Sequence, residues 1–365
     1  MKKLEDYLKY EQPTKYIVDS EKYSNVYDIP VLTAGKSFIL GYTNEKNNIF
    51  PKEELPVIIF DDFTTDCKYV DFPFKVKSSA MKILHPIKNA NAKFLYYYMK
   101  NIQFDSTLHK RYWISEYSQL SIKELNSKMQ DEFANKMQKL EKLIELKNKQ
   151  LQECNNLIKS QFVEMFGTNK KSKYPFDSLE NLTLKITDGK HGGCKGEKKS
   201  GYYFVGATEI YNDKINYQTA KEITKTDFEK DYKRCDLKNN DFVIVNTGAT
   251  IGKSTIVNTD LADHTLLQKS VALIRTKQEL INTIYLKYCY DANPDMYNKG
   301  NGCARINLLL SQIKETMIPV PPIELQNKFA MIVEQIDKQK FVNANLLQLL
   351  GKNLKRCYNN IIDFR

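Results

Sequence analysis

The sequence lacks low-complexity tracts, long apolar runs and any Cys-x-x-Cys pair. No apolar stretch approaches the ~20 residues that a transmembrane helix needs. The first residues, Met1-Lys-Lys-Leu-Glu-Asp6, lack the apolar core of a signal peptide. The seven cysteines are an odd number without metal-binding spacing, which excludes a disulfide framework and a zinc ribbon. We therefore expect a cytoplasmic protein with reduced thiols and no contact with a membrane.

Recognisable catalytic groups are also missing. The histidines show no metal-ligand spacing, and no Ser-His-Asp or paired-carboxylate arrangement can be identified. The segment Gly248-Ala-Thr-Ile-Gly-Lys-Ser254 follows an apolar run as a nucleotide-binding loop would, but it has one residue too few between its glycines. Asn293-Pro-Asp-Met296 resembles the signature of amino-methyltransferases, yet its third and fourth positions do not fit. We expect no catalytic residue, no metal and no cofactor, and hence no enzyme.

The charge is unbalanced toward the basic side. Lys and Arg number 55 against 44 Asp and Glu, which gives a net charge of +11. A basic protein favours polyanionic partners because its cations neutralise phosphates. Many lysine-rich proteins are basic for other reasons, so the charge leaves nucleic acid as one option among several.

A heptad seam is the most regular feature that the sequence does contain. Between residues 130 and 166, mostly apolar residues recur alternately four and three positions apart, which is the period of a coiled coil. Adding 196 to each number gives a second seam near the end of the chain. Both seams turn polar midway, where a buried polar group costs stability but can fix register. The residues expected to pair the helices include Phe133, Leu140, Lys147, Leu151, Phe329, Ile336, Lys340, Asn343 and Leu347.

Two long helices that each need a partner most simply pair with each other, as an antiparallel coiled coil with pseudo-two-fold symmetry. The alternative is that each helix lies on a globular core as an ordinary amphipathic helix. Because the helices divide the chain, we expect two globular domains of ordinary size. The expected parts are a first domain at 1–120, a first helix at 121–167, a second domain at 168–317 and a second helix at 318–365.

Both globular segments have a mixed α/β pattern, so the fold class is α+β. Each has short apolar runs that predict strands, followed by a segment that predicts a helix. The two segments follow the same order, which indicates a repeated domain. The predicted strands are 38–40 and 57–60 in the first segment and 242–245 and 270–274 in the second, and the predicted helices are 92–98 and 284–288.

The loop at residues 188–201 combines five glycines with several cationic side chains. Cations and bare backbone N–H groups can both approach the phosphates and bases of a groove. The alternative is a solvated flexible loop. The binding candidates in this loop are Lys190, His191, Lys195, Lys198 and Lys199.

Three motifs of the second half are characteristic: Asp188-Gly-Lys-His191, Asn246-Thr-Gly-Ala-Thr-Ile-Gly-Lys253, and Ile318-Pro-Val-Pro-Pro-Ile-Glu-Leu-Gln326 at the start of the second helix. In these motifs, and in the order of its parts over nearly its whole length, the chain resembles the DNA-specificity subunits of type I restriction-modification systems. The first domain departs from this pattern. It has no Asp-Gly-x-His start, and it carries Phe60-Asp-Asp-Phe-Thr64 where the second domain has its Thr-Gly-Ala-Thr turn.

The resemblance implies a non-catalytic protein with two target-recognition domains. Each domain would read one half of a split site in double-stranded DNA, and the paired helices would hold the domains apart. Methyltransferase subunits would dock on the helices and methylate adenine, and a restriction subunit is a further expected partner. Two alternatives stay open: the specificity subunit of a type II system with fused nuclease and methylase, and a coiled-coil scaffold that does not bind DNA. Further DNA-contact candidates are Thr250, Lys253 and Arg305 in the second domain and Lys36, Thr64 and Arg111 in the first.

Overall fold

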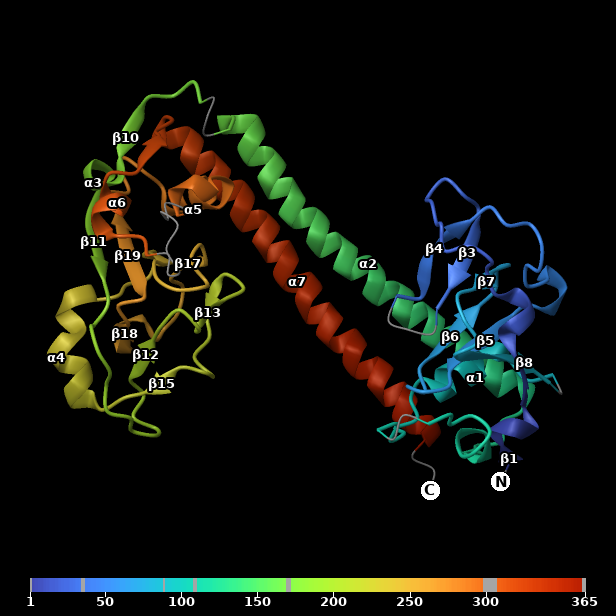
Figure 1. Cartoon of the computed structure of the whole chain (residues 1–365). Helices are drawn as coiled ribbons and strands as arrows, with labels where there is room; N and C mark the ends of the chain where they lie inside the picture. Colours follow the sequence, from blue (N-terminus) through green and yellow to red (C-terminus); the bar gives the residue numbers. More distant parts are fainter. Residues whose placement is uncertain are drawn as a thin grey trace. The chain divides into compact units, whose positions relative to one another are not determined.

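The computed structural model describes residues 2–33, 37–87, 89–107, 110–168, 172–297 and 307–362. The chain divides into two compact units (Figure 1). Unit 1 consists of residues 1–149 and 344–365, and unit 2 of residues 150–343. Each unit therefore combines one globular domain with parts of both long helices.

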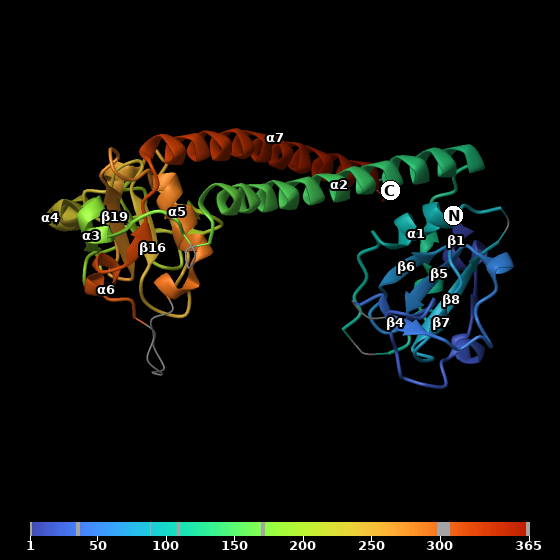
Figure 2. The ribbon, with the colours of Figure 1, turned by 90° about the horizontal axis from the view of Figure 1, so that it is seen from above.

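The core of unit 1 is a four-stranded antiparallel sheet in the order β2-β8-β5-β6. Figure 2 shows β5, β6 and β8 next to one another. The central strand β5 is buried along its whole length because both of its faces are covered. Its residues Ile58 and Phe60 face the helix α1, whereas Val57 and Ile59 face a second cluster. The bounds are β2 (Leu8–Glu11), β5 (Val57–Asp61), β6 (Cys67–Val70), β8 (Met81–Pro86) and α1 (Ala92–Met99).

A second, three-stranded sheet completes unit 1 in the order β4-β3-β7, with β3 and β7 parallel. A short antiparallel pair, β1 with β9, joins the first residues to the segment before the first long helix. The bounds are β1 (Lys2–Lys3), β3 (Ile29–Leu32), β4 (Ile39–Thr43), β7 (Lys75–Val76) and β9 (Ser121–Ile122).

Unit 2 repeats this topology. Its four-stranded sheet has the order β11-β19-β16-β17, and its three-stranded sheet has the order β15-β12-β18 with β12 and β18 parallel. The central strand β16 is again covered on both faces, with Phe242 and Ile244 toward α5 and Val243 and Val245 toward the other cluster. The bounds are β11 (Thr183–Asp188), β12 (Tyr203–Val205), β15 (Lys221–Glu222), β16 (Phe242–Val245), β17 (Ser254–Ile256), β18 (Thr265–Leu267), β19 (Val271–Thr276) and α5 (Thr283–Ala292).

Unit 2 also carries elements that unit 1 lacks in the part that the structure describes. In chain order, the hairpin β13–β14 and the helix α4 lie between β12 and β16. The corresponding stretch of unit 1, from β3 to β5, contains in its described residues only β4 and a 3-10 turn, η3 (Lys52–Glu54). The remaining bounds in unit 2 are β10 (Phe176–Ser178), α3 (Leu179–Leu182), β13 (Ile210–Tyr211), β14 (Lys214–Ile215), α4 (Lys225–Cys235), α6 (Leu310–Lys314) and β20 (Met317–Pro319).

These elements confirm the predicted fold class and the predicted repeat. The expected strands at 57–60 and 242–245 are β5 and β16, and the expected helices lie within α1 and α5. The segment after Lys253 forms the strand β17, and not the helix that a nucleotide-binding loop requires.

The long helices are α2 (Ser127–Phe166) and α7 (Ile323–Ile362), each of 40 residues. Their described seam positions are buried or half-buried, with Met137 0% and Ile158 1% exposed, whereas most positions between them are exposed. In unit 2 the end of α2 and the start of α7 share an aromatic core, in which Phe329 lies 5.5 Å from both Phe162 and Phe166 between ring centroids. Pairing of the helices along their whole length stays a prediction.

Candidate nucleic-acid interface

In unit 2, four turns meet at one end of the sheets. They follow β11 at Gly189 and Lys190, β12 at Gly206, β16 at Asn246, and β18 at residues 268–270, and we name them the strand-end turns. Backbone hydrogen bonds join them: the Lys190 N–H donates to the Leu267 carbonyl at 2.7 Å, and the Asn246 N–H donates to the Ser270 carbonyl at 3.0 Å. Loops gathered at one end of a rigid scaffold are the usual place for binding residues.

Glycine at position 189 allows this convergence. A Cβ atom there would collide with the backbone carbonyl of Leu267, and one at Gly206 would collide with the side chain of Gln268. The Asp-Gly-Lys-His motif therefore has a structural reason for its glycine, since only a residue without a side chain permits so close an approach of two backbones.

The basic loop at 188–201 is divided between two places. Lys190 and His191 lie at the strand-end turns, whereas residues 195–199 lie beside β15 and the start of α4. The Lys195 N–H donates to an Asp227 carboxylate oxygen at 2.6 Å, and the Lys199 N–H donates to the Glu222 carboxylate. Glu222 pairs with Tyr203 at the start of β12, whereas Leu267, which accepts from the Lys190 N–H, pairs with Val205 at its end. The backbones of the two groups of cations therefore lie at opposite ends of that strand. The structure therefore does not bring all five candidates together.

The Lys190 side chain is already engaged. Its ammonium group forms an ion pair with Asp231 of α4, and this hydrogen bond raises the pKa of Lys190. Lys195, Lys198 and Lys199 are exposed, as is His191, whose Nε2 lies 3.5 Å from an Asp188 carboxylate oxygen. Lys198 and Lys199 are thus better placed to meet phosphates than Lys190, which would first have to leave Asp231.

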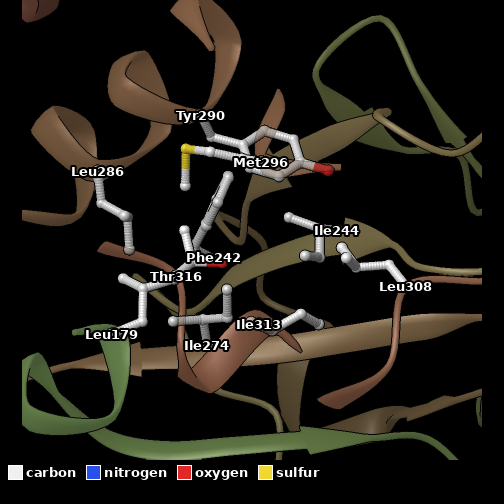
Figure 3. A pocket seen from close by; sticks show the side chains of 10 residues that line it. All are labelled: Leu179, Phe242, Ile244, Ile274, Leu286, Tyr290, Met296, Leu308, Ile313 and Thr316. Carbon is white, nitrogen blue, oxygen red and sulfur yellow. The ribbon is translucent and has the colours of Figure 1, made fainter. Parts of the chain in front are cut away.

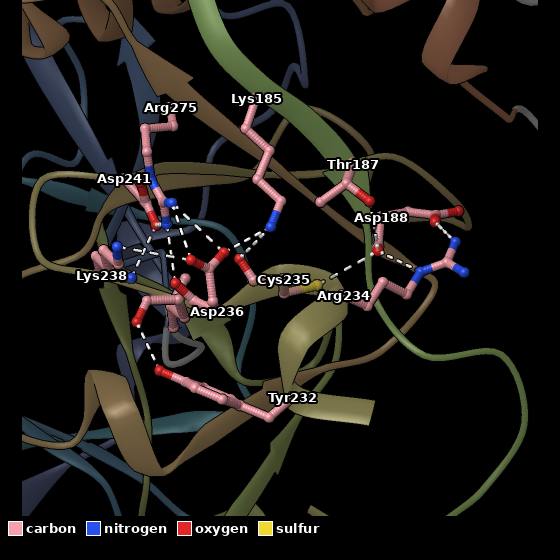
Figure 4. A network of polar contacts seen from close by, with 11 residues as sticks. Lys185, Thr187, Asp188, Tyr232, Arg234, Cys235, Asp236, Lys238, Asp241 and Arg275 are labelled. Carbon is pink, nitrogen blue, oxygen red and sulfur yellow. Dashed lines mark hydrogen bonds and ion pairs between the residues drawn. The ribbon is translucent and has the colours of Figure 1, made fainter. Parts of the chain in front are cut away.

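A partly buried ion-pair network fixes α4 against the sheet (Figure 4). The Arg275 guanidinium binds Asp241 at 2.7 Å and Asp236 at 3.2 Å. Burial acts to raise the pKa of Asp236, but the hydrogen bond from Lys185 and the charge of Arg275 outweigh it and lower the pKa. The Asp188 carboxylate accepts from Arg234, the last basic residue of α4. This network positions the acidic partners of the basic loop.

The turn at 246–253 contains the candidates Thr250 and Lys253. Gly248 and Gly252 have φ angles of +101° and +96°, a conformation that favours glycine. The Lys253 side chain is exposed, and its Nζ lies 5.6 Å from the centre of the Tyr211 ring. The Thr250 carbonyl accepts from the Lys253 N–H at 3.2 Å, which closes the turn.

The hairpin β13–β14 was not among the predicted site elements, although it lies next to Lys253. Its Tyr211 is 57% exposed. The hairpin turn has positive φ at Asn212 and Asp213, and the Asp213 carbonyl accepts from the Thr255 hydroxyl at 2.6 Å. An Asn-Asp pair between alternating residues is a hairpin signal that could have revealed this element in the sequence.

Unit 1 has an equivalent cluster with different residues. Asp62 follows β5 as Asn246 follows β16, and the Asp62 carbonyl accepts from the Tyr112 N–H at 2.9 Å as the Asn246 carbonyl accepts from the Leu308 N–H at 2.8 Å. The candidates Thr64 and Arg111 are both exposed and lie in the two segments that this bond joins. The structure therefore brings Thr64 and Arg111 to the same end of the sheet. The candidates Lys36 and Arg305 lie outside the described residues.

The Asp62 carboxylate holds the unit 1 cluster together. It accepts from the Trp113 N–H at 2.9 Å and forms an ion pair with Lys82 at 3.3 Å, and both Asp62 and Lys82 are buried. In unit 2 the Asn246 side chain occupies the equivalent place, and its buried Oδ1 has no hydrogen-bond partner among the described residues. The same backbone arrangement is thus supported by different chemistry.

Two other features of the described residues could be taken for binding sites, but their geometry suits a structural role. A cavity of about 10 Å³ lies between α5 and the unit 2 sheet (Figure 3) and is lined almost entirely by apolar side chains. Such a cavity is at the lower limit for one water molecule and does not suit a ligand.

In unit 1, three possible metal-binding groups lie together, those of Glu11, Glu54 and His85. The two ring nitrogens of His85 face different carboxylates, and Lys15 neutralises Glu11 at 2.9 Å, so this arrangement is an ion-pair cluster.

Comparison with known proteins identifies the class first. Residues 189–350 match the family model described as the type I restriction modification DNA specificity domain. This range contains the strand-end turns and much of α7. The second half of the chain is thus similar to type I DNA specificity domains.

The relatives extend this identification. The chain is 54% identical over 118 residues to the EcoR124I/EcoR124II specificity subunit of Escherichia coli, a match that spans 31% of this chain and 29% of the relative. It is 25% identical over 203 residues to the EcoBI specificity subunit of Escherichia coli, spanning 53% of this chain and 41% of the relative. Both matches therefore span less than half of the relative's length. The chain is thus similar in sequence to parts of two type I specificity subunits.

The fold agrees over nearly the whole chain. The structure of a type I restriction-modification S subunit from M. genitalium is similar with a TM-score of 0.65 at 15% identity, covering 99% of this chain and 95% of that one. A chain from a structural study of type I complex assembly is similar with a TM-score of 0.55 at 12% identity, covering 97% of both chains. None of the helices in the described ranges is both long and apolar enough to cross a membrane.

Proposed function

We propose that this chain is the specificity subunit of a type I restriction-modification complex. It reads a bipartite target in double-stranded DNA in the cytoplasm and directs adenine methylation or restriction by partner subunits. The observation that carries the proposal is the repeat: two units with the same strand order, each ending its sheet in a cluster of turns, but with different residues in those turns.

Two unlike reading surfaces on related scaffolds fit an asymmetric bipartite target, just as identical subunits fit a palindrome. In unit 2 the reading surface comprises the strand-end turns and the Tyr211–Lys253 pair, and the exposed Lys198 and Lys199, at the other end of β12, would add phosphate contacts at its edge. In unit 1 it comprises the turn at Thr64 and the segment at Arg111. Cations there would contact phosphates, and the polar and aromatic groups would contact base edges or sugars.

The chain itself supplies no chemistry in this proposal. Methyltransferase subunits bind to the long helices and carry out the reaction, and a restriction subunit joins the same complex. The helices hold the two reading surfaces at a fixed separation through their paired seams, so that helix length determines the spacer between the half-sites.

The direct test is to sequence the methylome of a host that carries this chain and a cognate methyltransferase. The proposal predicts methylated adenines within two fixed half-sites separated by a constant, unread spacer. Alanine at Lys198, Lys199 and Lys253 together, which would remove phosphate contacts, should lower the methylation of all target sites while both half-site sequences persist. A methylome that does not depend on this chain would refute the proposal.

A second test uses the purified chain with partner subunits in mobility-shift assays at increasing salt. A DNA reader releases counterions and loses affinity steeply as salt rises. A scaffold that binds only protein would show no such dependence.

A further inference from the structure

One buried glutamine occurs at the same place in both units. Gln130 stands in the first turns of α2 and Gln326 in the first turns of α7, separated by the 196 positions that relate the two helices. Gln130 is 6% exposed and Gln326 0% exposed. An uncharged polar side chain is rarely buried unless its hydrogen bonds are satisfied, so the partners of these amides matter.

The partners correspond one to one. Gln130 Oε1 accepts from the Asn91 N–H at 2.9 Å, and its Nε2 donates to the Leu125 carbonyl at 2.9 Å. Gln326 Oε1 accepts from the Asn282 N–H at 2.9 Å, and its Nε2 donates to the Pro321 carbonyl at 2.8 Å and the Leu280 carbonyl at 3.2 Å. Leu125 and Pro321 are again 196 positions apart.

Each amide joins three parts of its unit. Asn91 and Asn282 are the N-cap residues of α1 and α5, whose side chains accept from Phe94 N–H and Ile284 N–H. These short helices pack on the sheets that carry the reading surfaces. Leu125 and Pro321 belong to the segments that lead into the long helices. One side chain therefore links the domain, the connecting segment and the long helix.

The rest of each joint is apolar. Phe133 of α2 packs edge-on against Phe94 of α1 at 5.9 Å between ring centroids, and Phe329 of α7 packs in the same way against Tyr288 of α5 at 5.3 Å. Apolar packing is non-directional and tolerates sliding and rotation, whereas hydrogen bonds depend steeply on distance and angle. The glutamine amide is thus suited to fix the angle that the aromatic contact leaves free.

We propose that Gln130 and Gln326 are positioning residues that set the angle of each target-recognition domain on its long helix, and thereby the distance between the two half-sites that the protein accepts. This inference rests on the proposed function for its DNA readout. It assigns no contact with DNA to either glutamine.

The first measurement needs no DNA. Spin labels are placed through non-natural amino acids on the exposed positions Lys225 of α4 and Lys338 of α7, both in unit 2, and their distance distribution is recorded in the full chain. Gln326→Met keeps the volume and removes the hydrogen bonds. It should widen or shift the distribution, whereas Gln335→Met on the exposed face of α7 should leave it unchanged. Gln326→Asn, which withdraws the amide by one methylene, serves if the methionine variant does not fold.

The second measurement uses the complex with its methyltransferase and the half-sites defined for the unaltered protein. Wild type should prefer its native spacer over spacers one base pair longer or shorter by roughly tenfold, the size of a single-base discrimination. In Gln326→Met and in Gln130→Met this preference should fall toward unity while the half-site sequences persist.

The outcomes separate the two proposals. An unchanged label distribution, with affinity lost equally for every spacer, would show that the glutamines only stabilise the fold and would overturn the inference. If wild type binds no bipartite DNA but the label distribution still widens in Gln326→Met, the positioning role stands and the proposed function fails.

Discussion

The two domains share a strand order but support their turns by opposite means. In unit 1 the residue after the central strand is a buried carboxylate, Asp62, which is paired with the buried Lys82 and with the Trp113 N–H. In unit 2 the equivalent residue is Asn246, whose buried oxygen has no partner in the described part of the chain. The topology therefore requires the backbone arrangement and leaves the side chains free to differ. That freedom is what two domains need if they read different sequences.

The largest expected effect follows from this contrast. Asp62→Ala leaves the buried Lys82 ammonium without its partner and should lower the free energy of unfolding of unit 1 by ~3–5 kcal/mol. Asn246→Ala breaks no hydrogen bond of the side-chain oxygen within the described part of the chain and should lower the free energy of unfolding by only about 1 kcal/mol. Denaturant unfolding of the Asp62 variant is followed by the fluorescence of Trp113, the one tryptophan of the sequence, which lies in unit 1, and that of the Asn246 variant by circular dichroism. Equal costs for both variants would show that the two turns are supported alike.

The second effect concerns backbone approach. Gly189→Ala places a methyl group against the backbone carbonyl of Leu267, and a backbone cannot move aside as a flexible side chain can. The substitution should therefore lower the free energy of unfolding by ~1–3 kcal/mol. The matched control is Gly193→Ala in the same loop, where a Cβ atom meets nothing within 4 Å. Thermal unfolding of both variants is followed by circular dichroism, and only Gly189→Ala should melt at a lower temperature than wild type. A Gly189→Ala protein as stable as wild type would contradict the assigned role of this glycine.

The third effect separates the cations of the basic loop. Removing a phosphate contact lowers the salt slope of DNA binding by about 1, so Lys198→Ala and Lys199→Ala should each show this loss if they contact phosphates. Lys190→Ala should show a smaller loss, because Lys190 already has Asp231 as its counterion. Lys314→Ala, which removes a lysine paired with Glu180, serves as the control. Equal slopes for Lys190→Ala and Lys198→Ala would refute this distinction.

The smallest effect is a pH dependence in unit 2. The folded protein lowers the pKa of Asp236. The ionised carboxylate therefore stabilises the fold above the ordinary pKa of aspartate, about 4. This stabilisation is lost as the pH falls through the lower pKa of the folded state. Asp236→Asn should therefore reduce stability at neutral pH by about 1 kcal/mol or less, since the pair is partly exposed, and the difference from wild type should shrink in acid. Urea unfolding at pH 7 and pH 3 measures it. If Asp236→Asn lowers the free energy of unfolding as much at pH 3 as at pH 7, the lowered pKa of Asp236 is not the source of its stabilisation.

The sequence predicted the elements whose signal is regular and local. Apolar runs revealed β5 and β16, and the heptad period revealed both long helices, because burial on one face imposes a repeat on the chain. The hairpin at Tyr211 was missed because its strands of two residues carry no periodicity, which leaves the Asn212-Asp213 pair of its turn as the signal.

The site was harder to predict because its partners are distant in sequence. Lys190 pairs with a residue 41 positions away, and Lys199 with one 23 positions away. Nothing local to the basic loop shows that one of its cations is neutralised or that the loop divides between two ends of a strand. The glutamines at 130 and 326 were visible as a repeat, but a polar residue in a first helical turn does not reveal its burial.

The central claim is that two unlike units read two half-sites at a separation set by the long helices. The most direct measurement is the methylome of a host carrying a variant with one heptad inserted in each helix. Seven residues add ~10 Å at ~1.5 Å per residue, or about three base pairs, while the seam keeps facing its partner. The half-site sequences should persist and the spacer should grow by about three base pairs. An active complex that still methylates the original spacing would contradict the account.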